Sequence, residues 1–199
     1  MMKSRSAQAL AFVFAFIVAA AARAETTKFE ATLTGDSESL STATGMADVI
    51  YNSVLHTLHV DVTFTGLLAP DTASHIHAAT ALPLAGNAGV ATTVPSFPGF
   101  PLGVTSGSYD QTLDLTSLTS FNPSYVTAHG GTAASAEDAL VAALFADKAY
   151  LNVHSSEFPG GEIRGFLVGV PDNCATGLLV TGGALAMLGL ARCQRRRSS

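Results

Sequence analysis

The chain has 199 residues, with 15 acidic and 10 basic side chains and a formal net charge of −5. Charge is unevenly distributed, because residues 25–169 hold fourteen acidic side chains against three basic ones, a formal charge of −11. Such an acidic segment lacks the basic surface that nucleic-acid binding requires. Both cysteines, Cys174 and Cys193, lie beyond it, which excludes a disulfide scaffold and a thiolate-ligated zinc site within it.

The N-terminal residues predict a secretory signal peptide. A short basic region precedes an apolar run over residues 10–22, and Ala22-Arg23-Ala24 has the small-x-small pattern of a cleavage site. The run is shorter than the roughly 20 apolar residues of a transmembrane helix, which favours cleavage over an uncleaved anchor. We therefore expect residues 1–24 to be removed on export.

Residues 25–169 are expected to form one domain of about 145 residues, enough for a substantial core. In "TLHVDVTFT", residues 57–65, apolar and polar side chains alternate strictly. Such alternation predicts antiparallel strands with one face on a core and the other toward water. The same pattern occurs in "KFEATLTG" (28–35) and "KAYLNVHS" (148–155), and "GEIRGFLVG" (161–169) is expected to supply a last strand. Segments such as "ATGMAD" (43–48) and "SEFPGGE" (156–162) predict turns.

One helix is expected within this β-rich pattern, in "SAEDALVAALFADKA", residues 135–149. Ser135 and Asp138 have the spacing of a capping box. Apolar side chains recur at helical spacing, at Leu140, Val141, Leu144 and Phe145. The predicted fold class is therefore all-β, an antiparallel Greek-key sandwich with one short helix.

The C-terminal segment, residues 170–199, predicts a transmembrane helix. An apolar stretch over residues 175–191 is followed by an arginine cluster, and basic residues beside an apolar segment stay in the cytoplasm. Together with the signal peptide, this order places residues 25–169 outside the cytoplasmic membrane. A plain C-terminal membrane anchor is one interpretation of this tail.

A second interpretation comes from a resemblance to bacterial C-terminal sorting signals of the PEP-CTERM type, closest to the VPDSG-CTERM variant. The resemblance rests on a short motif, a glycine-rich apolar segment and a basic cluster, formed by Val170, Pro171, Asp172 and then Arg195, Arg196 and Arg197. Asn173-Cys174 stands where that variant usually has Ser-Gly. The resemblance implies an exosortase-type sorting protease as a partner and a location in the cell envelope or at the cell surface.

Two stretches of the middle segment resemble the CHRD domain, a module named from chordin. They are "DVTFTGLLAPDTASHIHAAT" (61–80) and "AYLNVHSSEFPGGEIRGFL" (149–167), and the resemblance extends over about residues 29–168. It implies an exported β-sandwich of poorly defined function. The prediction is a non-catalytic binding or structural module of the cell envelope.

A fainter resemblance connects the histidines with copper/zinc superoxide dismutase, also an antiparallel sandwich with a His-x-His on one strand. The matching positions are His75, His77 and His154. The resemblance implies an immunoglobulin-like or dismutase-like sandwich and a metal site. No bridging histidine or cysteine pair of that enzyme is found in the domain, and no nucleophile elbow or phosphate loop appears, so no enzyme activity is predicted.

The histidine pattern by itself allows two roles. His75 and His77 stand at i and i+2 of a strand, so they point the same way, and they can converge on one ion with His154 from another strand and His129 from a loop. Such a set suits zinc or copper. In the alternative role the rings hydrogen-bond to loop carbonyls or to an acidic neighbour such as Glu162.

Glu162 and Arg164 form the remaining polar pattern. They alternate around Ile163, so a regular strand would place them on one face. The pattern predicts a structural role for both side chains, as an ion pair with each other or with partners across strands.

Overall fold

The computed structural model describes residues 26–35 and 41–171. These residues form one sheet of eight antiparallel strands in the order β4-β6-β7-β1-β2-β3-β5, with β8 also paired to β1. The strands are β1 Thr26–Gly35, β2 Thr44–Asn52, β3 Thr57–Thr65, β4 Asp71–His77, β5 Gly107–Asp114, β6 Tyr150–Ser155, β7 Ile163–Phe166 and β8 Val168–Gly169. The α-helices are α1 Pro123–Ala128 and α2 Ala133–Phe145, and a short 3-10 helix spans Leu118–Ser120.

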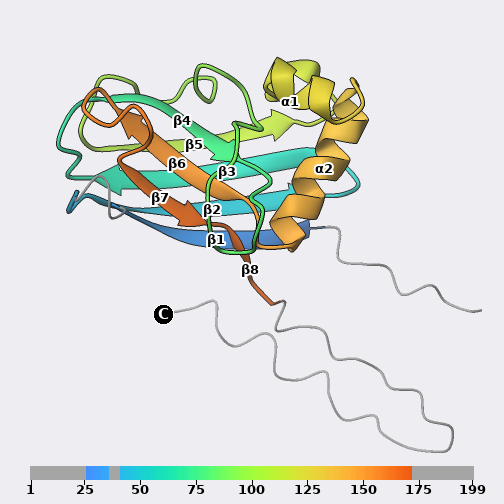
Figure 1. The fold of residues 1–199 in the computed structure, drawn as a ribbon, viewed down its shortest axis with the longest axis horizontal. Coiled ribbons are helices and arrows are strands. Elements are labelled where there is room, and N and C mark those ends of the chain that lie inside the picture. Colours follow the sequence, from blue (N-terminus) through green and yellow to red (C-terminus); the bar gives the residue numbers. More distant parts are fainter. Residues whose placement is uncertain (1–25, 36–40, 172–199) are drawn as a thin grey trace, which may run out of the picture.

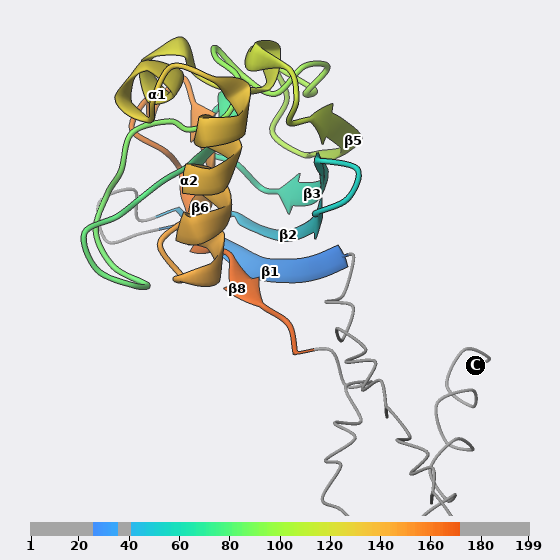
Figure 2. The same ribbon diagram turned by 90° about the vertical axis from the view of Figure 1, so that its right-hand side faces the viewer.

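The sheet is strongly curled around its core (Figures 1 and 2). Its two end strands, β4 and β5, are not paired with each other. The loop between them closes the gap with aromatic contacts, because Phe97 stacks on Tyr109 at 5.5 Å and Phe100 stacks on Phe64 at 5.6 Å between ring centroids. Helix α2 lies across one end of the curl (Figure 2). This mostly antiparallel architecture agrees with the predicted all-β sandwich class.

Strand β3 confirms its predicted alternation. The inward side chains Leu58, Val60 and Val62 are fully buried and Phe64 is nearly so, whereas the residues between them are at least partly exposed. They pack with inward side chains of β1 and with Leu140 and Leu144 of α2 in one apolar core. Burial of each such side chain contributes about 1.5–3 kcal/mol to folding.

The "ATGMAD" segment is not a turn, as the sequence suggested, but belongs to β2. Its glycine is required by strand packing, since a Cβ at Gly45 would lie 2.5 Å from the carbonyl oxygen of Thr63. A glycine that permits close backbone approach therefore resembled a turn signal in the sequence.

The predicted helix over residues 135–149 starts earlier and ends earlier. Thr132 is the N-cap and forms a capping box with Ser135, so the predicted pairing of Ser135 with Asp138 is wrong. The helix ends before Asp147, whose φ of 55° is left-handed. Helix α1, which begins with Pro123 behind an Asn122 cap, is a second helix that the sequence analysis missed.

Strand β6 differs from its prediction in a way that matters for function. All six of its residues are buried, although alternation indicated one water-facing side. The strand lies inside the sheet between β4 and β7, and its polar face, formed by Tyr150, Asn152 and His154, is covered by loops.

The predicted signal peptide and transmembrane helix lie outside the described residues, as do all but Val170 and Pro171 of the sorting motif. Within residues 26–35 and 41–171, no helix has the length and apolar character needed to cross a bilayer.

A row of carboxylates crosses the outer face of the sheet. The pairing register sets Glu30 opposite Asp48, Asp48 opposite Asp61, and Asp61 opposite Asp110. Lys28 contacts Glu30 at 2.6 Å and Asp48 at 2.8 Å. Like charges directly opposite each other on neighbouring strands destabilise a sheet.

Replacing Asp61→Asn is therefore expected to raise the free energy of unfolding by about 0.2–1 kcal/mol at low salt. The gain should shrink at about 1 M salt, where screening acts within a few ångströms. Urea denaturation measures both values. Glu157→Gln removes the same charge from an exposed loop and is the control. An equal gain in this control would contradict the proposed repulsion within the row.

Candidate metal centre

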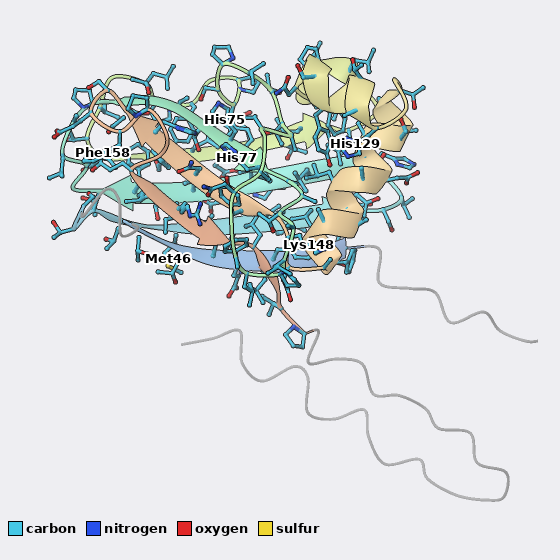
Figure 3. The ribbon with its side chains drawn as sticks, viewed as in Figure 1. Met46, His75, His77, His129, Lys148 and Phe158 are labelled. Carbon is cyan, nitrogen blue, oxygen red and sulfur yellow. The ribbon has the colours of Figure 1, made fainter. Side chains whose placement is uncertain are left out.

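Three buried histidines from two neighbouring strands converge. His75 and His77 lie on β4 and His154 lies on β6, each 6–7 % exposed. One ring nitrogen from each lies within 4.8 Å of the other two. The antiparallel register explains this, because Ala73 is opposite His154 and places that ring beside His75 on one face. Figure 3 shows His75 and His77 on this face of the sheet.

Each ring uses its other nitrogen to bond a backbone carbonyl. His75 Nε2 lies 2.6 Å from the Pro95 oxygen, His77 Nδ1 lies 2.9 Å from the Ala88 oxygen, and His154 Nδ1 lies 2.9 Å from the Pro159 oxygen. A carbonyl only accepts hydrogen bonds, so the ring nitrogen must carry the proton in each case. Any other tautomer would place two acceptors against each other at these distances.

The three remaining nitrogens therefore carry lone pairs and face one another. They are His75 Nδ1, His77 Nε2 and His154 Nε2. His75 Nδ1 and His154 Nε2 are 3.2 Å apart, and His77 Nε2 is buried without a hydrogen-bond partner among the described residues. Buried acceptors that face each other are unfavourable unless a proton or a cation lies between them.

An additional proton is disfavoured at neutral pH. Burial lowers the pKa of His75 and His77 to about 4, although the carbonyls of Pro95 and Ala88 act in the opposite direction. Burial also lowers the pKa of His154. The rings are therefore neutral at pH 7, which is the form in which histidine binds metals.

One loop provides two of the three orienting carbonyls. We call residues 86–96 the covering loop; it contains Ala88 and Pro95. Tyr150 holds it, because its hydroxyl lies 3.3 Å from the Ala88 oxygen and its ring stacks on His77 at 4.8 Å. Arg164 also holds it through bonds to the Asn87 side chain and the Gly86 carbonyl.

The Arg164 guanidinium lies over the Tyr150 ring, 4.8 Å from its centroid. Arginine, tyrosine and His77 thus form one stack against the covering loop. The covering loop, which orients His77, is therefore held by Arg164 of β7 as well as by Tyr150 of β6.

The turn at residues 159–161 orients the other side of the site. Pro159 accepts from His154, and the Gly160 carbonyl accepts from Asn152 Nδ2 at 3.1 Å. Gly161 has a φ of 125°, and a Cβ there would collide with the Asn152 amide. Gly161 is therefore needed for the close contact of this turn with β6.

His129, predicted as a possible fourth member, does not join this group. It is the C-cap of α1, where its Nδ1 lies 2.8 Å from the Tyr125 oxygen and its ring packs on the Tyr125 ring at 4.1 Å between centroids. Figure 3 shows it at the helical end of the domain, away from His75 and His77. The helix that the sequence analysis missed accounts for this position.

Glu162 and Arg164, predicted to pair with each other or across strands, do not pair with each other, and each has its own partners. Glu162 precedes β7 and follows the left-handed Gly161, so strand alternation does not include it. Its buried carboxylate accepts from the Ser41 hydroxyl and the Leu68 amide, both at 2.7 Å. It does not touch the histidines.

Sequence reasoning missed Tyr150 and Asn152 as members of this site. Both share the alternation phase of His154 in "YLNVH", and a histidine on a strand face predicts that residues two and four positions earlier are its neighbours. The orienting carbonyls have no sequence signal, because any residue provides one.

The domain is thus a mostly antiparallel β-fold with a buried three-histidine cluster under its loops. The profile of the CHRD domain matches residues 29–167, and the chain belongs to that family. No curated protein matches the sequence.

The depressed histidine pKa values predict how stability depends on pH. In the metal-free protein, unfolded rings take up protons near pH 6.5, whereas folded His75 and His77 remain neutral until about pH 4. The unfolded state then binds more protons, so stability falls as pH decreases through this window, by up to about 1.4 kcal/mol per pH unit and ring.

Urea denaturation between about pH 8 and pH 4 tests this dependence. His77→Gln should flatten the curve, whereas His59→Gln, at a partly exposed ring on the outer face, should not. Parallel curves for the wild type and His77→Gln would contradict the assignment.

Proposed function

We propose that this domain binds one zinc or copper ion through His75, His77 and His154. The observation that supports the proposal is the orientation of the rings: each N–H points outward to a carbonyl, and each lone pair points inward. A purely structural role requires a partner for every buried nitrogen, and His77 Nε2 has none in the described part of the chain.

The spacing fits a small cation. Two nitrogens bound to zinc at about 2.0–2.1 Å in tetrahedral geometry are about 3.3–3.4 Å apart. The separation of His75 Nδ1 and His154 Nε2 is 3.2 Å, and the set lies within 4.8 Å. His77 thus needs only a small shift to complete the set.

The chemistry of the three ligands limits which metal ion can bind. Neutral imidazoles suit zinc and copper, whereas calcium and magnesium prefer oxygen ligands. Backbone carbonyls that accept from the ring N–H groups are the usual outer partners of metal-bound histidine, where they fix the tautomer and increase ligand basicity. Ala88, Pro95 and Pro159 would have this role.

The proposed cellular setting is the bacterial envelope. The sequence supports export by residues 1–24 and attachment or sorting by residues 170–199, and the strongly acidic domain is suited to remain in solution beside the membrane. The module would bind metal there as a non-catalytic component of the envelope or its matrix.

Untagged protein should bind one equivalent of zinc or copper, measured by elemental analysis and by titration of metal-free protein. His77→Ala and His154→Ala should each weaken binding by at least about 100-fold, since loss of an outer partner alone costs 10–100-fold. Metal at about 100 times its Kd should stabilise the wild type by about 2.7 kcal/mol.

His129→Ala is the matched control, because it removes an imidazole outside the cluster. Equal binding by the wild type and the His77→Ala variant would contradict the proposal. Thermal melting of each metal-free variant separates a loss of ligand from a loss of fold.

Localisation tests the proposed attachment. Full-length protein should fractionate with the cell envelope, and deletion of residues 192–197 should release it or change its processing. Cell fractionation and the apparent mass of the product measure this. Protein that is secreted in soluble form both with and without residues 192–197 would refute attachment through the tail.

A further inference from the structure

The buried Asn152 side chain has an amide oxygen that accepts no hydrogen bond from the described residues. Its Nδ2 donates to the Gly160 carbonyl, which fixes the orientation of the amide, and its Oδ1 is buried without a partner among the described residues. Asn152 is only 2 % exposed. An unpaired buried amide oxygen costs about 1–3 kcal/mol, so a hydrogen-bond donor is needed beside it.

Asn152 lies in the same polar layer as the cluster. It is directly opposite His75 on β4, and its neighbours on the same face of β6 are Tyr150 and His154. Opposite residues on paired strands have Cβ atoms about 4.5–5.5 Å apart. The amide is therefore next to the rings whose lone pairs face inward.

The cluster also lacks a fourth ligand. Among the described residues, the group that can hold an ion consists of three histidines and includes no carboxylate or thiolate. Tetrahedral zinc takes four ligands, and sites with three protein ligands keep the fourth position for water or another small molecule. A metal-bound water carries hydrogens that an amide oxygen accepts.

We infer that the bound metal keeps an exchangeable position for water or a small anion, and that Asn152 Oδ1 positions this ligand. The inference rests on the proposed metal binding. A single bound water or anion would account for both the missing fourth ligand and the unpaired Asn152 oxygen.

Cobalt(II) and azide provide a direct test on purified full-length protein. Cobalt replaces zinc in tetrahedral sites and has a visible spectrum that reports its ligands, so azide should change this spectrum saturably. The copper(II)-loaded protein should increase the relaxation rate of water protons through exchange of the bound water. Both measurements use the wild type, so they do not depend on the folding of a variant.

The outcomes separate the two proposals. Failure to bind zinc, copper or cobalt overturns the proposed function and this inference with it. Metal binding without an azide response and without exchange-enhanced water relaxation overturns only the exchangeable position. Metal binding with both responses supports it.

Asn152→Ala tests the positioning role. It should change the azide affinity by at least about fivefold while the metal affinity changes less than the 10–100-fold typical of outer partners. A merely structural effect would change both affinities together. Asn52→Ala, which removes an amide whose oxygen accepts from the Val54 and Leu55 amides in the exposed β2–β3 turn, is the remote control and should leave both unchanged. Wild-type azide affinity in Asn152→Ala would exclude this role for Asn152.

Discussion

Burial of the polar face of β6 is the constraint on which the rest of this domain depends. A strand between two others contributes one face to the core, here through Leu151 and Val153, and its opposite face is usually solvated. In this protein loops cover that opposite face, so Asn152 and His154 need partners from the protein. The turn at residues 159–161 supplies them as the carbonyls of Gly160 and Pro159. The covering loop supplies the Ala88 carbonyl to Tyr150 on the same face of the strand.

The same loop also completes the sheet. Its hydroxyls from Thr92 and Ser96 accept from the backbone amides of Ile76 and Ser74, which satisfies the outer edge of β4. An exposed edge strand is a site for unwanted pairing, so this cover has a protective role. The covering loop therefore protects the edge and orients two histidines. A shift of this loop would move the Ala88 and Pro95 carbonyls and so change the orientation of the His77 and His75 rings.

The sequence predicts those parts of the fold that repeat a period. Strand β3 has alternating side chains over its whole length, and the His-x-His pair follows the same rule, so both predictions agree with the structure. The predictions were wrong at single residues whose type fits two different local structures. Gly45 resembled a turn residue because close approach of Thr63 is not visible locally, and Ser135 resembled a cap because Thr132 uses the same chemistry.

The pairing of distant polar groups is a second kind of information that the sequence lacks. Glu162 and Arg164 are two residues apart, yet one binds the Leu68 amide and the other binds Asn87, because the left-handed Gly161 removes Glu162 from the strand phase. Backbone carbonyls are equally invisible, since every residue has one. Only the folded chain determines which carbonyl faces a ring.

A structural role and a metal-binding role do not exclude each other in these histidines, because the two nitrogens of each ring have different partners. An imidazole has two nitrogens and, when neutral, one proton. The loops use the protonated nitrogen of His75, His77 and His154 as a structural contact. These contacts are also what turns the unprotonated nitrogens toward one another, so the structural bonds prepare a set of lone pairs rather than replace it. The structural role and the metal-binding role therefore belong to one site. The rings would bind the ion, and the loop carbonyls would act on it through the rings that they orient.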